Sequence, residues 1–113
     1  MAYVFANGTG TEADPYQVAT ADDLNGVRDY LSAYFIQMAD IDLSGYENWE
    51  PIGNPYQQYF SGEYDGNGHE VNGLTINRTG WSHSGLFGYL KNATVKNLGV
   101  ININMSGVDY VGG

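Results

Sequence analysis

The sequence has no cysteine, few cations and no long apolar run. Without cysteine the chain can form neither disulfides nor a thiolate metal site. Only 4 Lys and Arg stand against 13 Asp and Glu, which gives a net charge of −9. Such a chain cannot neutralise a phosphate backbone, so we expect no nucleic-acid partner. No stretch approaches the roughly 18 apolar residues that a helix needs to span a bilayer, so we expect no membrane insertion.

The charge is unevenly distributed along the chain. Residues 1–70 hold 12 acids and only Arg28, a net charge of −11. Residues 71–113 hold three cations and only Asp109, a net charge of +2. We therefore expect one end of the molecule to be strongly acidic and the other nearly neutral.

Glycine, tyrosine and a repeated pattern define the expected architecture. With 16 Gly, 10 Tyr and 15% charged residues, the composition favours turn-rich β structure in one domain. A pattern of three apolar residues recurs at a constant offset of 24 positions. Its members are Val71, Leu74 and Ile76, then Val95, Leu98 and Val100. This offset predicts a β-solenoid in which the two triplets stack as parallel neighbours.

Local patterns predict one helix and a series of short strands. Thr20 is a suitable N-cap for a helix over Ala21 to Ser32, whose apolar face is Leu24, Val27 and Leu31. The turn at 65–68 should place Asn67 or Gly68 at positive φ. Strands are expected over 3–5, 16–18, 35–38, 41–43, 60–64, 71–76, 86–89 and 95–105.

Gly85-Leu86-Phe87-Gly88 and the segments before it resemble bacterial surface-protein repeats that carry the GLUG motif. The matching segments are 7–11, 14–16, 20–31, 40–44, 49–53, 60–69 and 97–99. The resemblance implies a right-handed parallel β-helix with an N-terminal helical cap, in large secreted or wall-attached proteins that include adhesin-like and IgA-protease-type members. The chain length predicts one β-solenoid domain over 1–113, with strand, loop and capping helix in 1–34 and coils in 35–113. The last coil is expected to be truncated, because Gly113 would take the place of Gly85 in the next copy of the repeat.

The sequence offers no motif for catalysis. His69 and His83 are isolated, and the chain has no nucleophile elbow, phosphate-binding loop or helical His-Glu pair. We therefore expect neither an enzyme nor a cofactor.

Three aspartates are the candidates for a cation. Asp40 and Asp42 leave the same face of one strand, and Asp65 lies in the glycine-rich turn. The turn matches neither an EF-hand nor a repeat-in-toxin loop, so we predict exposed strand and turn residues, with weak calcium binding as the alternative.

Five aromatic residues are candidates for stacking against sugar rings, and packing over a coil edge is the alternative. They are Tyr46, Trp49, Tyr56, Tyr59 and Trp81.

The leading functional hypothesis is a non-catalytic extracellular structural or adhesion module. Its expected partners are further repeats of a longer parent protein or a second copy of itself, with surface glycans or host proteins as ligands. Alternatives are a carbohydrate-binding or polysaccharide-degrading β-helix fragment and a self-assembling filament subunit. The uneven charge favours head-to-tail contacts through an edge that comprises Val95, Leu98, Val100, Tyr110 and Val111.

Overall fold

The computed structural model describes residues 2–53, 58–81 and 85–108, with backbone alone for 78–81 and 105–108. An N-terminal loop leads to strand β1 (Tyr16–Val18), helix α1 (Ala21–Gly26) and a 3-10 turn, η1 (Val27–Asp29). Short strands follow along the rest of the described chain. They are β2 (Tyr34–Gln37), β3 (Ile41–Asp42), β4 (Glu63–Asp65), β5 (Glu70–Asn72), β6 (Thr75–Trp81), β7 (Thr94–Lys96), β8 (Gly99–Ile101) and β9 (Asn104–Val108).

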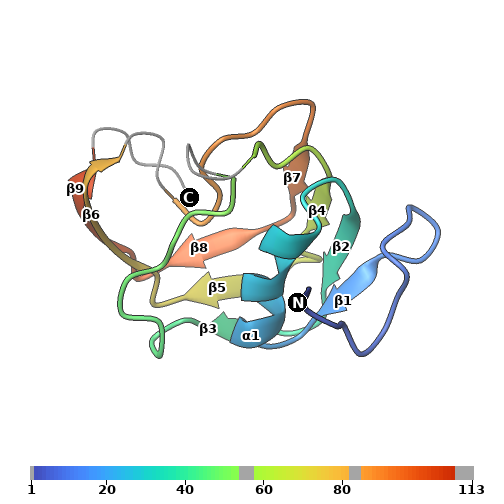
Figure 1. The fold of residues 1–113 in the computed structure, drawn as a ribbon. Helices are drawn as coiled ribbons and strands as arrows, with labels where there is room; N and C mark the ends of the chain where they lie inside the picture. The colour runs from blue at the N-terminus through green and yellow to red at the C-terminus, as the bar shows by residue number, and fades with distance from the viewer. Residues whose placement is uncertain (1, 54–57, 82–84, 109–113) are drawn as a thin grey trace.

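The strands form three parallel sheets that the chain visits in turn. Sheet A has the order β1-β2-β4-β7, sheet B the order β3-β5-β8, and sheet C pairs β6 with β9. The middle circuit (β4, β5 and β6) is followed by the last circuit (β7, β8 and β9), each strand of which pairs in parallel with its counterpart. Figure 1 shows β3, β5 and β8 stacked in this order. The mainly β architecture and the parallel pairing are as predicted.

The predicted partners, however, are wrong. Val71 lies opposite Val100, Ile76 lies opposite Met105, and Val95 lies opposite Tyr64, so each circuit is longer than the repeat read from the sequence. The prediction fails because each triplet spans a strand, a corner and the next strand, but the two triplets lie at different corners of the circuit. The first copy turns from sheet B into sheet C, and the second turns from sheet A into sheet B.

Residues at positive φ mark the corners. Asn67 (φ 56°) and Gly68 (φ 78°) both adopt the left-handed conformation predicted for this turn, and Asn97 (φ 55°) repeats it one circuit later. Asn and Gly tolerate this conformation better than other residues. The Asn97 side-chain amide donates to Asp65 Oδ1 at 3.2 Å. The corners of the two circuits are therefore superimposed and hydrogen-bonded to each other.

Helix α1 packs over the first strands, as predicted. Thr20 Oγ1 accepts a hydrogen bond from the Asp23 amide at 3.0 Å, while Leu24 and Val27 are fully buried. Half-buried Leu31 also packs against the core. In Figure 1, α1 lies beside β1 at the N-terminal end of the stack.

The helix is shorter than predicted and residues 3–5 form no strand. A Cβ at Gly26 would overlap the Tyr3 ring, so glycine is required where Tyr3 packs. Phe5 stacks on Tyr16 at 4.6 Å. Ring packing, not sheet pairing, therefore fixes the N-terminal segment. Residues 86–89 are likewise no strand, since Phe87 forms a single bridge to Ile52.

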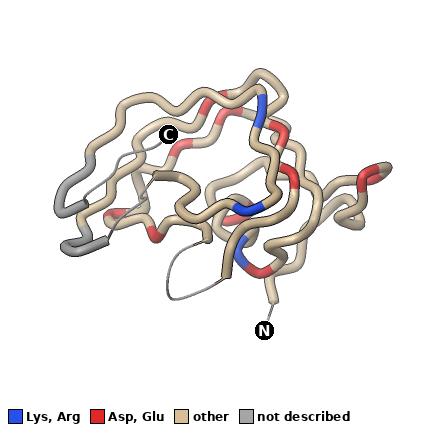
Figure 2. Tube along the Cα trace, turned by 90° about the horizontal axis from the view of Figure 1, so that it is seen from above, with Lys and Arg blue, Asp and Glu red and all other residues tan. Residues whose placement is uncertain are grey.

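The core lies between the three sheets and is rich in aromatic residues. Its largest fully buried side chains include Trp49, Tyr64, Phe35 and Phe60. In Figure 2 far more of the trace is coloured for Asp and Glu than for Lys and Arg, and long stretches carry neither. The sequence from Val71 to Val108 contains no acidic residue, so the last circuit belongs to the less acidic part, as predicted.

Candidate functional site

Within the described residues, the last circuit forms an open edge of all three sheets. Strands β7, β8 and β9 each end a sheet. Val95 and Val100 are half-buried, whereas their partners in the middle circuit, Tyr64 and Val71, are fully buried. Leu98 is also half-buried. Three residues of the predicted assembly edge therefore lie where a further circuit would cover them, and Tyr110 and Val111 lie outside the described residues.

The opposite end is covered by the chain itself. The Gln17 amide of β1 donates to Asn7 O at 3.1 Å, which brings the N-terminal loop against sheet A. The Trp49 amide donates to Thr75 O at 2.8 Å, and the Asn77 amide donates to Asn48 Oδ1 at 2.9 Å. These contacts cover β6 on the side away from β9. Because α1 packs over the same end, the two ends of the stack are not equivalent.

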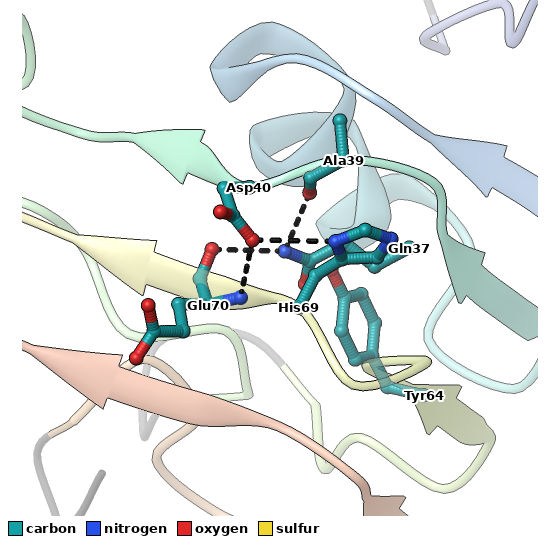
Figure 3. A network of polar contacts seen from close by, with 6 residues as sticks. All are labelled: Gln37, Ala39, Asp40, Tyr64, His69 and Glu70. Carbon is teal, nitrogen blue, oxygen red and sulfur yellow. Dashed lines mark hydrogen bonds and ion pairs between the residues drawn. The ribbon is translucent and has the colours of Figure 1, made fainter.

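A polar depression of about 840 Å³ lies at the stacked corners between sheets A and B. Figure 3 shows Asp40 on the corner after β2, above His69 and Glu70 of the next circuit. Asp40 Oδ1 accepts hydrogen bonds from the Glu70 amide at 3.0 Å and from His69 Nδ1 at 3.2 Å. The full lining is Asp40, Gly68, His69, Glu70, Asn97, Leu98 and Gly99.

The three aspartates proposed as cation ligands accept hydrogen bonds at the corners, Asp40 from the next circuit and Asp42 and Asp65 within their own turns. The Glu70 amide, followed by His69, lowers the pKa of Asp40, and the Ser44 amide lowers the pKa of Asp42. Asp65 Oδ1 accepts from the Asn67 amide at 2.8 Å. In the part of the chain that the structure describes, no group of three or more His, Cys, Asp or Glu is placed to hold a metal ion. Asp40 and Asp42 are exposed, Asp65 is half-buried, and all three carboxylates accept hydrogen bonds from backbone amides at the corners.

The lowered pKa of Asp40 predicts an acid-sensitive corner. A carboxylate with a depressed folded-state pKa stabilises the fold above its unfolded pKa, and this contribution is lost as pH falls through the folded value. Asp40→Asn should therefore flatten the decline of stability below about pH 4. Chemical denaturation across pH would measure it. Glu12→Gln, in the exposed N-terminal loop, is the control, and equal slopes for both variants would contradict the prediction.

The five candidate aromatics do not form one site. Trp49 is 1% exposed, with Nε1 donating to Leu86 O at 3.2 Å and the Arg28 guanidinium 5.3 Å from its ring. Half-buried Tyr46 contacts Trp49 edge-on and donates to Asp22 Oδ1 at 2.7 Å. Burial, then this hydrogen bond, raises the pKa of Tyr46 to about 12. A sugar-stacking role for Trp49 is therefore wrong, because the ring belongs to the core.

One aromatic candidate remains at the surface. Tyr59 is 54% exposed, and its ring contacts Tyr89 edge-on at 6.3 Å and the Lys91 ammonium at 5.5 Å. Tyr56 and the side chain of Trp81 lie outside the described residues. Sequence reasoning missed Tyr89 and Lys91, although Tyr89 follows Tyr59 by one full circuit, the spacing that also separates Asn97 from Asn67.

Comparisons with known proteins give two relatives and one similar structure. The chain is 44% identical over 103 residues to a protein of Evansella cellulosilytica named "Putative Gly-rich membrane protein", covering 84% of this chain and 12% of that protein. It is 33% identical over 117 residues to Halomucin of Haloquadratum walsbyi, covering 93% of this chain and 1% of that protein. No family model matches.

The similar structure is a crystal structure of a "putative immunoglobulin A1 protease" from Bacteroides ovatus. It aligns with a TM-score of 0.72 and 27% identity, over 88% of this chain and 30% of that one. The chain thus spans only a small part of each protein it matches. Within the described residues, no helix has the length and apolar character needed to cross a bilayer.

Proposed function

We propose that this chain is a non-catalytic module of an extracellular surface protein, built as the capped first part of a right-handed parallel β-helix of the GLUG type. Stacked parallel circuits and a covered N-terminal end support this fold. The names of two relatives, a Gly-rich membrane protein and Halomucin, support a location at the cell surface. In this role the module extends from the surface and presents its outer faces to ligands.

The open edge is the main observation behind this proposal. In a stack of circuits each circuit buries its inward side chains against the next. Val95, Leu98 and Val100 are half-buried where such a neighbour would lie. A further circuit of a longer parent chain is the natural occupant, since both relatives are far longer than the segment they share with this chain.

When no further circuit is present, a second copy of the chain is the proposed partner. The charge distribution favours head-to-tail contacts, because the C-terminal part would meet an acidic surface. The covered strand edges at the N-terminal end favour the other arrangement, with two open edges face to face. The face-to-face arrangement also removes more apolar surface from water, and it closes as a dimer instead of growing into a filament.

Sedimentation equilibrium would test this assembly. We expect a dimer that persists between about 20 mM and about 500 mM salt, because salt screens interactions between charges and this dimer is held by buried apolar surface. Ile103→Lys, at a 41% exposed position between β8 and β9, should weaken the dimer. Met38→Lys, 45% exposed beside β2, is the matched control. A monomer at all concentrations would contradict self-association, and a dimer lost at high salt would favour head-to-tail contacts.

A further inference from the structure

Tyr59 and Tyr89 occupy equivalent outward positions on successive circuits. Phe60 and Leu90 form a parallel bridge, and the Phe60 amide donates to Tyr89 O at 3.0 Å. Phe60 points inward and is fully buried, so its neighbour Tyr59 is left at the surface, 54% exposed. The two tyrosine rings meet edge to face at 6.3 Å.

The backbone beneath these tyrosines is held from several sides. The Lys91 amide donates to Phe60 O at 3.0 Å, and the Gly88 amide donates to Ile52 O at 2.9 Å. The Tyr89 amide donates to Gly53 O, and Gly53 adopts φ 75°. A Cβ at Gly53 would overlap the Tyr89 carbonyl oxygen, so only glycine allows this approach. The backbone that carries the two tyrosine rings is therefore preorganised by hydrogen bonds to neighbouring segments.

Lys91 gives this surface a positive charge in an acidic protein. Arg28 pairs with Glu50 at 3.3 Å and Lys96 with Glu63 at 3.8 Å. Lys91 forms no ion pair with any described carboxylate, and its ammonium lies 5.5 Å from the Tyr59 ring. The sequence has no acidic residue over 51–62 or 71–108, the stretches that supply this surface.

We propose that Tyr59, Tyr89 and Lys91 form a binding site for an acidic polysaccharide. A tyrosine ring offers an apolar face for the C–H groups of a sugar and a hydroxyl for its polar edge. The Lys91 ammonium pairs with a sugar carboxylate, which selects uronate residues over neutral sugars. The net charge of −9 opposes an anionic ligand, but charges beyond about 10 Å are largely screened at physiological salt.

Affinity electrophoresis of the full chain in gels that contain polygalacturonate would test this site. Polygalacturonate should retard the wild type, and dextran, a neutral glycan, should not. Tyr59→Ala and Lys91→Gln should each raise the dissociation constant at least about threefold, while Lys91→Arg retains binding. Lys96→Gln, which removes a lysine already paired with Glu63, is the matched control and should bind like the wild type. Circular dichroism of each variant would establish that it is folded.

The site does not exist if polygalacturonate fails to retard the wild type, if Tyr59→Ala and Lys91→Gln bind as tightly as Lys96→Gln, or if dextran retards the chain equally. The inference rests on the proposed function because a surface module meets such polysaccharides. The two can fail separately: loss of glycan retardation with an intact dimer rejects the site, and a monomer that polygalacturonate still retards rejects the assembly.

Discussion

Trp49→Ala is expected to lower the free energy of unfolding by about 3 to 5 kcal/mol, the range measured when large aromatic residues are truncated in a core. Trp49 is 1% exposed, its indole N–H donates to Leu86 O at 3.2 Å, and the Arg28 guanidinium packs 5.3 Å from the ring. The substitution would leave a cavity and would also remove the cation–π contact. Since small domains are stable by only about 5 to 15 kcal/mol, much of the stability should be lost.

Tyr59→Ala is the matched control, because it removes an aromatic side chain that is 54% exposed. Its expected effect is only about 1 kcal/mol, because it removes half-exposed contacts with Tyr89 and Lys91 and leaves no cavity in the core. Denaturant titrations of both variants would measure the difference. Similar midpoints for the two variants would contradict the placement of Trp49 in the core.

The two aromatic residues also show what sequence reasoning could not settle. Trp49 and Tyr59 lie in the same Pro-containing stretch of sequence, and local pattern alone gives both the same assignment. Their burial differs because Trp49 follows Asn48 along the edge of β6, while Tyr59 precedes an inward Phe60. Such contacts join residues a full circuit apart, and local periodicity does not contain them.

The parallel pairing was predictable and the register was not. Apolar triplets separated by glycine-containing turns are typical of stacked strands, and these strands do pair in parallel. The coil length inferred from two triplets is right only if both occupy the same corner. Here they occupy different corners that use similar residues. A better guide would have been the corner residues, since Asn67 is followed one circuit later by Asn97, and Gly73 by Asn102, all at positive φ.

The capping helix was predictable because its determinants are local. Thr20 as N-cap and Leu24 as a buried residue follow from spacing within a few residues. The requirement for glycine at position 26 comes from the ring of Tyr3, which lies far earlier in the chain. The surface site around Lys91 was missed for the same reason, since Tyr59 and Lys91 meet only when two circuits stack.

The second large effect is expected at a buried polar network that joins sheets A and B (Figure 3). Gln37 is fully buried, and its Nε2 donates to Ala39 O at 2.8 Å and to Glu70 O at 3.1 Å. Its Oε1 accepts from the Tyr64 hydroxyl at 2.8 Å. Burial raises the pKa of Tyr64, so this hydroxyl stays protonated and able to donate. The amide nitrogen and the amide oxygen of this buried glutamine are thus both hydrogen-bonded, to groups from three segments of the chain.

Gln37→Met, which keeps the shape but removes the polar atoms, should destabilise the fold by about 3 kcal/mol, because it leaves the Tyr64 hydroxyl and two carbonyls without this partner. Tyr64→Phe should cost about 1 to 2 kcal/mol, since it leaves only Gln37 Oε1 unpaired.

The double variant Gln37→Met with Tyr64→Phe decides whether the pair acts as a unit. Removing both partners eliminates the orphaned hydroxyl, so its cost should be smaller than the sum of the two single costs by about 1 kcal/mol or more. Denaturant unfolding of the four proteins, at a pH where no carboxylate titrates, would complete the cycle. Strict additivity would mean that the 2.8 Å contact does not couple the two side chains. Coupling would instead identify Gln37 as the residue that fixes how the corner after β2 meets β4 and β5, and hence where the Asp40 and His69 corner lies.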